Sequence, residues 1–183
     1  MLRQPLAWAA VLVGLTAAER VHQVLWERSW DVLPFPDSCD KLVSGGFQVP
    51  REGVRLQDCT IGAEAKLKIQ LDGPLIVDGS LTVRGRAEFR ARSEPFQEAC
   101  LQVKDGLTIS GHLEIYGCHN DANDDEGRGN VIGGCLNASS LSMEDGSLSL
   151  EKCSSKGAGG CVALGSLRQR RPARWISKYV TRR

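Results

Sequence analysis

Apolar and polar residues alternate in short segments along this chain, and the alternation returns at a fixed interval. Three consecutive segments are repeated 26 positions later without a gap. The matching apolar positions are Leu75, Val77, Leu81, Val83, Ala87 and Phe89, followed by Leu101, Val103, Leu107, Ile109, Leu113 and Ile115. An interval of this length is typical of repeat proteins, in which successive units stack on one another.

The interval continues toward the C-terminus with one interruption. Leu101 recurs as Leu136 and Leu107 as Leu141, so the interval is longer here and differs by one position between the two pairs. The excess falls on the polar, acidic and glycine-containing stretch 119–132. Such a stretch predicts a loop inserted into one repeat. After the loop the original interval returns, and Leu136 recurs as Val162.

The repeated segments are predicted to be β-strands. They are three to five residues long with a period of two, and small residues or Asp-Gly pairs separate them. This pattern is typical of strands with one buried face. No helical period is found between residues 39 and 167. Gly45–Val49 is expected to be a degenerate first repeat that matches 73–77.

The pattern therefore predicts an all-β fold, a short right-handed parallel β-helix over residues 45–167. Strands this short are stable only when neighbouring repeats pair with them. The solenoid would have about four to five coils with a period of about 26 residues, above the minimum for a continuous core. Leu75, Leu101, Leu136 and Val162 would form one buried column. The alternative, an antiparallel sandwich, explains the alternation but not the fixed interval.

The N-terminal region is expected to form a helical extension. Residues 1–18 combine Arg3 with an apolar run and end in small residues, which is the pattern of an export signal. An uncleaved membrane anchor and a helix that caps the solenoid are the alternatives. Residues 19–44 are interpreted as a lead or cap, in which Trp26 and Trp30 are placed to cover the first coil or to contact a partner.

The C-terminal segment 168–183 is predicted to be a basic amphipathic helix. The chain has a net charge of +1, but its last eighteen residues hold seven Lys and Arg and no acid, which leaves −6 on the remainder. Such a helix would cap the last coil, or dock on an anionic membrane surface or an acidic partner. Nucleic acid is not expected as a partner. The interaction candidates at the two ends are Trp26, Trp30, Arg171, Arg174, Trp175, Lys178 and Tyr179.

Five of the seven cysteines take equivalent places in successive repeats. One set is Cys100, Cys135 and Cys161, and the other is Cys118 and Cys153. Stacked Cα atoms about 4.8 Å apart fall within the range of a disulfide, so a bond between neighbouring coils is one interpretation. A ladder of buried free thiols is the other, and it is favoured for part of the set because stacked side chains point in parallel.

The remaining two cysteines, Cys39 and Cys59, flank the first coil. They are candidates for a bond that fastens the coil to the segment before it. An odd total leaves at least one cysteine without a partner in the chain.

The acidic insertion is the main candidate metal site, ahead of the neighbouring Cys118 and His119, at which zinc is not expected. Its oxygen donors, a weak calcium candidate, are Asp121, Asn123, Asp124, Asp125 and Glu126. The spacing matches the first three ligand positions of an EF-hand, but Glu126 replaces the glycine and Ile132 the final glutamate. A solvated loop is the favoured interpretation, so no metal and no cofactor are expected.

No pattern of an active site is found. Glu88 and Glu114 take equivalent places in successive repeats and would stack on one outer face, but the arginines around them favour a charge-paired sheet over a catalytic pair. The chain contains no nucleophile-elbow, phosphate-loop, zinc-protease or dinucleotide motif. It also has no Thr-x-Thr ladder of the kind expected in a surface-binding solenoid.

The coil pattern resembles the right-handed parallel β-helix superfamily with the pectin-lyase-like fold. The sequences 133–136 (Gly-Gly-Cys-Leu) and 159–162 (Gly-Gly-Cys-Val) are similar to the Gly-Gly-Ala-Ile motif in repeats of chlamydial polymorphic outer-membrane proteins. The Phe-x-x-Asn partner motif of those repeats is absent. The resemblance implies the fold over about residues 45–167, and no lyase catalytic residue carries over by motif.

These observations favour an exported, non-enzymatic β-solenoid that serves as a structural or interaction subunit. We expect protein partners, in a peripheral part of a membrane-associated complex. The alternative is a carbohydrate-binding or polysaccharide-lyase-like β-helix, for which a polysaccharide would be the partner. The insertion and the two ends are the places where function is expected.

Overall fold

The computed structural model of the 183-residue chain describes residues 32–92, 96, 98–120, 134–155, 161–169, 174–178 and 181–182, with only the backbone described at 175–178 and 181–182. The chain divides into two units, Met1–Asp31 and Val32–Arg183. The described residues all belong to the second unit. The N-terminal helix predicted for 1–18 therefore lies outside them.

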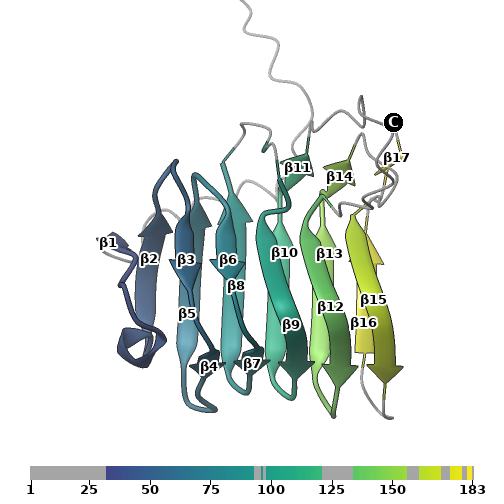
Figure 1. Cartoon of the computed structure of the whole chain (residues 1–183), viewed down its shortest axis with the longest axis horizontal. Helices are drawn as coiled ribbons and strands as arrows, with labels where there is room; N and C mark the ends of the chain where they lie inside the picture. The colour runs from purple at the N-terminus through teal and green to yellow at the C-terminus, as the bar shows by residue number, and fades with distance from the viewer. Residues whose placement is uncertain are drawn as a thin grey trace, which may run out of the picture. The chain divides into compact units, whose positions relative to one another are not determined.

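The second unit is built of parallel strands in three sheets (Figure 1). The first sheet has the order β1 (Val32–Pro34), β2 (Gly45–Val49), β5 (Lys66–Leu71), β8 (Arg86–Ala91), β10 (His112–Tyr116), β13 (Ser147–Glu151) and β16 (Arg174–Lys178). The second has the order β15 (Val162–Gln169), β12 (Leu136–Met143), β9 (Leu101–Ile109), β6 (Leu75–Val77) and β3 (Val54–Leu56), with β7 (Leu81–Val83) beside β9 and β4 (Cys59–Ile61) beside β7. The third has the order β11 (His119–Asn120), β14 (Ser154–Ser155) and β17 (Thr181–Arg182). Among the described residues, the one helical element is the 3₁₀ turn η1 (Cys39–Lys41).

The chain alternates between the first and second sheets, so each repeat adds a strand to both. The predicted all-β, parallel arrangement is confirmed, and the antiparallel sandwich is excluded for the described strands. In Figure 1 the colours advance from one side of the sheets to the other in chain order. Repeats that are successive in sequence are therefore neighbours in space.

The predicted register is confirmed through the insertion. Leu75 pairs with Leu101, Leu101 with Leu136, and Leu136 with Val162. The one-position difference between the Leu101–Leu136 and Leu107–Leu141 intervals has a local cause, because a β-bulge between Ala138 and Ser140 shifts the register of β12 against β9. A bulge lets two residues on one strand face one on its neighbour. The inserted residues 121–133 themselves lie outside the described residues.

One repeat was missed in the sequence pattern. Gly45–Val49 pairs with Leu67–Leu71 and not with 73–77, so the predicted match was wrong. The strands β3, β4 and β5 form a complete repeat between them. This repeat is shorter than those that follow, since Val54 already pairs with Leu75. A search for one fixed interval passes over a repeat that is shorter than its neighbours.

The core lies between the two larger sheets. Inward positions along each strand carry Leu, Ile, Val, Phe and Ala, and most are fully buried. Phe89, Ile115 and Leu150 form one such column in the first sheet. Burial of each large apolar side chain contributes roughly 1.5–3 kcal/mol before the entropy cost of folding.

The helix predicted for the C-terminal segment was wrong over the part that is described. Residues 174–178 form strand β16, which pairs in register with β13, so Trp175 takes the place next to Leu148. The apolar residues had been assigned to one stripe of a helix. The open edge of β13 offers backbone hydrogen bonds to an extended segment, and this tertiary pairing overrides the local helical spacing.

Candidate functional site

Charged and polar side chains cover the outer face of the first sheet, where they alternate with core residues. The parallel register stacks them in three columns. These columns are Lys68, Glu88, Glu114 and Ser149; then Gln70, Arg90, Tyr116 and Glu151; then Arg86, His112 and Ser147. The prediction that Glu88 and Glu114 stack on one face is confirmed.

The two stacked carboxylates are compensated by nearby nitrogen groups. Glu88 is only 9% exposed and accepts a hydrogen bond from Nε of Arg86 at 2.7 Å. The Oε2 atom of Glu114 lies 3.6 Å from Nε2 of His112, which is positive when protonated. Glycoside hydrolysis needs one carboxyl group to donate a proton and another to attack or to activate water. A carboxylate that is hydrogen-bonded to a neighbouring guanidinium, as Glu88 is, is better suited to stabilising the sheet than to this catalytic role.

Tyr116 lies between two cationic side chains on this face. The guanidinium of Arg90 is 4.8 Å from the centre of its ring, and Nζ of Lys152 is 5.2 Å from it. Arg90 belongs to β8 and Lys152 follows β13, which lie on opposite sides of β10. Both cations therefore make cation–π contacts with the Tyr116 ring. This engagement works against the use of Tyr116 as a platform for stacking a sugar.

Two histidine–serine pairs tie neighbouring repeats together. Nδ1 of His112 lies 2.7 Å from Oγ of Ser147, and Nδ1 of His119 lies 2.7 Å from Oγ of Ser154. The hydroxyl of Ser147 therefore contacts the imidazole of His112, which in turn lies near the carboxylate of Glu114. The same histidine–serine contact recurs one strand further along at the same separation, which favours a structural role. Neither pair was predicted from the sequence, although each follows the longer interval across the inserted loop.

A compact ion cluster joins β3, the residue after β6, and β9 in the second sheet. Oδ1 of Asp78 is 2.6 Å from Nη1 of Arg55 and 2.6 Å from Nζ of Lys104. The hydrogen bond from Lys104, together with the positive charges of both partners, lowers the pKa of Asp78 below its usual 3.8. The three residues come from three successive repeats, so the cluster joins the repeats to one another.

Six cysteines form three disulfides, and two of these bonds each lie within a single repeat. The disulfides are Cys39–Cys59, Cys100–Cys118 and Cys135–Cys153, with Cα–Cα distances of 5.3, 6.2 and 6.1 Å. The bond from Cys39 to Cys59 fastens η1 to β4, as expected. The favoured interpretation, buried free thiols for part of the stacked set, holds for Cys161 alone. A bond between the stacked Cys118 and Cys153, which was one of the two interpretations, was wrong, and so was a free-thiol ladder for these two residues.

The reason is the direction of the side chains. Cys100 precedes β9 in the second sheet, and Cys118 follows β10 in the first, and both are fully buried. Side chains that enter the core from opposite sheets point toward each other, whereas stacked ones point in parallel. The signal in the sequence was the separation of 18, which both disulfides share.

Cys161 is the remaining cysteine, and it is a buried thiol. Its Sγ atom and those of Cys135 and Cys153 all lie within 4.8 Å of one another. Burial raises the pKa of the Cys161 thiol to about 11. With the other two sulfurs in a disulfide, the cluster offers one thiol, too few for a metal site.

A column of hydroxyl groups runs along the outer face of the second sheet. Thr60 pairs with Thr82, Thr82 with Thr108, and Thr108 with Ser142. The sequence has no Thr-x-Thr motif, so no such ladder was expected. The column is made by stacking across repeats, which a motif within one strand does not reveal.

Large apolar side chains are exposed at the two ends of the stack. Among the described residues they are Val32, Leu33, Val43 and Leu167. Val32 and Leu33 belong to β1, the first strand of its sheet, and Val43 precedes β2. Leu167 is 54% exposed on β15, at the opposite end of the second sheet.

Most residues predicted to carry function lie outside the described part of the chain. This applies to Trp26, Trp30, Arg171 and Tyr179, and to the calcium candidates Asp121, Asn123, Asp124, Asp125 and Glu126. Arg174 begins β16 and is exposed. Trp175 and Lys178 are on the same strand.

Comparison with protein-family models, curated proteins and solved structures finds no match to this chain. Three disulfides are typical of a protein that folds in an oxidising compartment. Within the described residues, no helix has the length and apolar character needed to cross a membrane.

Proposed function

We propose that this protein is an exported, non-enzymatic parallel β-helix that acts as an interaction subunit through the ends of its stack. Its setting would be the periphery of a membrane-associated complex. The oxidised cysteines and the apolar run in residues 1–18 support export. The seven Lys and Arg of the last eighteen residues support attraction to an anionic membrane surface.

The alternation of the chain between two parallel sheets supports the β-helix. Each described repeat supplies at least one strand to each larger sheet, in an order that follows the chain. A coil that winds in one direction has this order, and the right hand is the rule for parallel connections. The pectin-lyase-like repeats that the sequence resembles have the same architecture.

The proposal depends above all on the position of the exposed apolar side chains. Among the described residues they occur only at the first strands and at β15. Leu167 continues the column of Leu107 and Leu141, both of which are buried. A column that stops at the last strand leaves an apolar side chain that a further repeat would cover.

We infer that the occupant of this end is a strand from a partner protein. In the order of the described strands, β15 is the last strand of its sheet, and an edge position supports the addition of a further strand. The partner strand would place an apolar residue opposite Leu167 and an acidic residue beside Arg168.

The experiment is to isolate the protein from its own cells under mild conditions and to measure its mass. The native protein is expected in a particle larger than its own 19.9 kDa. Leu167→Glu should release it as a monomer, because a charge replaces the apolar contact. Ser110→Glu, an exposed position after β9 in the middle of the second sheet, should leave the particle intact.

Two outcomes would contradict the proposal. One is a native monomer that cleaves a polysaccharide, and the other is a particle that both variants leave unchanged. The N-terminal residue of the same preparation tests export, since a cleaved signal would leave a chain that begins close to residue 19.

A second candidate, carbohydrate binding, is favoured by the hydroxyl column Thr60, Thr82, Thr108 and Ser142. Such groups, repeated about every 4.8 Å, suit the hydroxyls of an extended polysaccharide. The double change Thr82→Val and Thr108→Val removes two hydroxyls at nearly constant volume. It should weaken retention on a polysaccharide column about thirtyfold, since each of the two hydrogen bonds contributes about 1 kcal/mol. Equal retention would dismiss this candidate.

A further inference from the structure

The cluster of Cys135, Cys153 and Cys161 brings a free thiol next to a disulfide. Cys161 is 6% exposed, and its Sγ lies within 4.8 Å of both bonded sulfurs. Its backbone is fixed there, because its carbonyl oxygen accepts hydrogen bonds from the N–H groups of Cys135 at 2.9 Å and Leu136 at 3.2 Å. The thiol is therefore held over the disulfide by the pairing of adjacent repeats.

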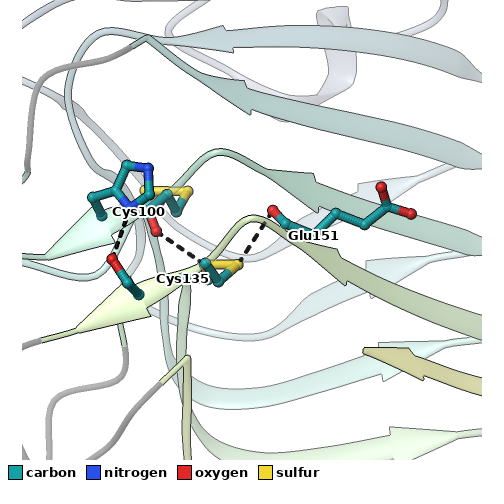
Figure 2. Close-up of a disulfide and its surroundings, with 7 residues drawn as sticks. Cys100, Cys135 and Glu151 are labelled. Atoms are coloured by element: carbon teal, nitrogen blue, oxygen red, sulfur yellow. Dashed lines mark hydrogen bonds between the residues drawn. A yellow bond between two sulfur atoms is a disulfide. The ribbon is translucent and has the colours of Figure 1, made fainter. Parts of the chain in front are cut away.

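Each bonded sulfur also has a hydrogen-bond acceptor close to it. Sγ of Cys135 is 3.5 Å from the carbonyl oxygen of Cys118, and Sγ of Cys153 is 3.7 Å from the carbonyl oxygen of Glu151 (Figure 2). A sulfur in a disulfide has no hydrogen to donate. A thiol formed at either position would have one, and its acceptor is already in place.

We propose that Cys161 is the attacking thiol of an internal exchange that moves the Cys135–Cys153 disulfide between two repeats. The proposal concerns the covalent chemistry of the core and does not rest on the interaction function. It assigns a role to the one cysteine that the disulfides leave free.

The exchange conserves bonds and electrons. The thiol of Cys161 gives its proton to solvent, and the thiolate attacks Sγ of Cys135 or Cys153. A new bond to Cys161 forms as the Cys135–Cys153 bond breaks, and the displaced thiolate takes up a proton. One disulfide and one thiol exist before and after, so no oxidant or reductant is consumed.

The surroundings of Cys161 determine the rate. Burial raises its pKa to about 11, so the thiol form predominates at neutral pH and the exchange is slow there. Burial also excludes bulky external thiols. As the pH is raised toward that pKa, the rate of exchange is expected to increase about tenfold for each pH unit, because the thiolate is the nucleophile.

The exchange changes which parts of the chain are cross-linked. The Cys135–Cys153 bond closes one repeat, from the start of β12 to the end of β13. A bond from Cys161 would instead join that repeat to the next, at the start of β15. The last repeat would then be covalently fastened to the stack.

The test is to follow the position of the free thiol in the folded full chain. The protein is held at about pH 8, 9 and 10, where the thiolate fraction rises stepwise. Samples are quenched in acid, unfolded, alkylated at the free thiol and mapped by peptide mass. Label should begin on Cys161 and spread to Cys135 or Cys153, faster at each higher pH.

The Cys100–Cys118 disulfide is an internal control, because it has the same separation of 18 and lies two repeats from the free thiol. It should remain unlabelled. Label that stays on Cys161 alone would overturn the proposal. Label that spreads equally to Cys100 and Cys118 would also overturn it, since that pattern indicates exchange through unfolding.

Two variants make the result independent of alkaline conditions. Cys153→Ser leaves Cys135 and Cys161 as the available pair, and Cys135→Ser leaves Cys153 and Cys161. After refolding in a glutathione redox buffer, at least one variant should contain a disulfide to Cys161. Absence of that bond in both variants, with the circular dichroism of the native fold, would contradict the proposal.

Discussion

Gly111 lies directly against the backbone carbonyl oxygen of Gly85, the equivalent residue of the preceding repeat. A Cβ atom at Gly111 would overlap that oxygen, and backbone cannot move aside as a flexible side chain can. Gly111→Ala is therefore expected to destabilise the protein by about 1–3 kcal/mol, the usual cost of overpacking. Urea unfolding followed by circular dichroism measures the loss.

Gly62→Ala is the matched control for this substitution. A Cβ atom at Gly62 would meet nothing within 4 Å. The urea midpoint of the Gly62→Ala variant should therefore stay the same or rise slightly. Equal losses for the two variants would show that the close approach at Gly111 is not the cause.

Leu136 tests the central column of the core. It is fully buried and pairs with Leu101 on one side and Val162 on the other. Leu136→Ala is expected to cost about 2–5 kcal/mol, because it removes packed methyl groups from between two repeats. Thermal unfolding of this variant is compared with that of Gln102→Ala, at an outward position on β9. The comparison distinguishes the loss of core packing from a general effect of shortening a side chain. A change below about 1 kcal/mol at Leu136 would argue against a continuous column.

The Cys100–Cys118 bond is expected to stabilise the stack. It closes a loop between residues separated by 18 positions, so its loss frees the unfolded chain. Replacing both cysteines with serine should lower the free energy of unfolding by about 2–4 kcal/mol. The single variant Cys161→Ser breaks no bond and should change it much less. Denaturant titration of the two proteins under non-reducing conditions makes the comparison.

Asp78 makes the stability sensitive to acid. Its pKa in the folded protein is lowered, first by the hydrogen bond from Lys104, below the usual 3.8 of the unfolded chain. Its contribution is thus present above about pH 4 and is lost as the pH falls through the lowered value. Asp78→Asn should show a shallower loss of stability below about pH 4 than the natural chain. Asp105→Asn, at an exposed position on β9, is the control and should lose stability with falling pH as the natural chain does. Identical curves of unfolding free energy against pH for all three proteins would show that Asp78 does not cause the acid sensitivity.

The core of the fold was predictable because its register depends on side chains that repeat. Leu75, Leu101 and Leu136 occupy one column in the structure as they do in the aligned sequence. The repeat containing β5 was not found, because it is shorter than the interval that the later repeats share. Trp175 was assigned to a helix, because the local pattern does not contain the open edge of β13 with which β16 pairs.

The candidate sites were less predictable for the same reason. The stacking of Glu88 on Glu114 followed from the interval. The hydrogen bond between Glu88 and Arg86 depends on the side-chain conformations of both residues, which the interval does not specify. The hydroxyl column from Thr60 to Ser142 crosses several repeats and has no motif within a strand. Features built across repeats are found only when every register is known.

The sequence by itself determined the parallel, repeating all-β core and the odd number of cysteines. Both follow from one-dimensional information, the spacing of apolar positions and a count. The tertiary structure alone decided that Cys100 bonds to Cys118 and that Cys161 lies beside the Cys135–Cys153 bond. Disulfide partners depend on the direction of side chains across a core, and spacing along the chain does not specify that direction.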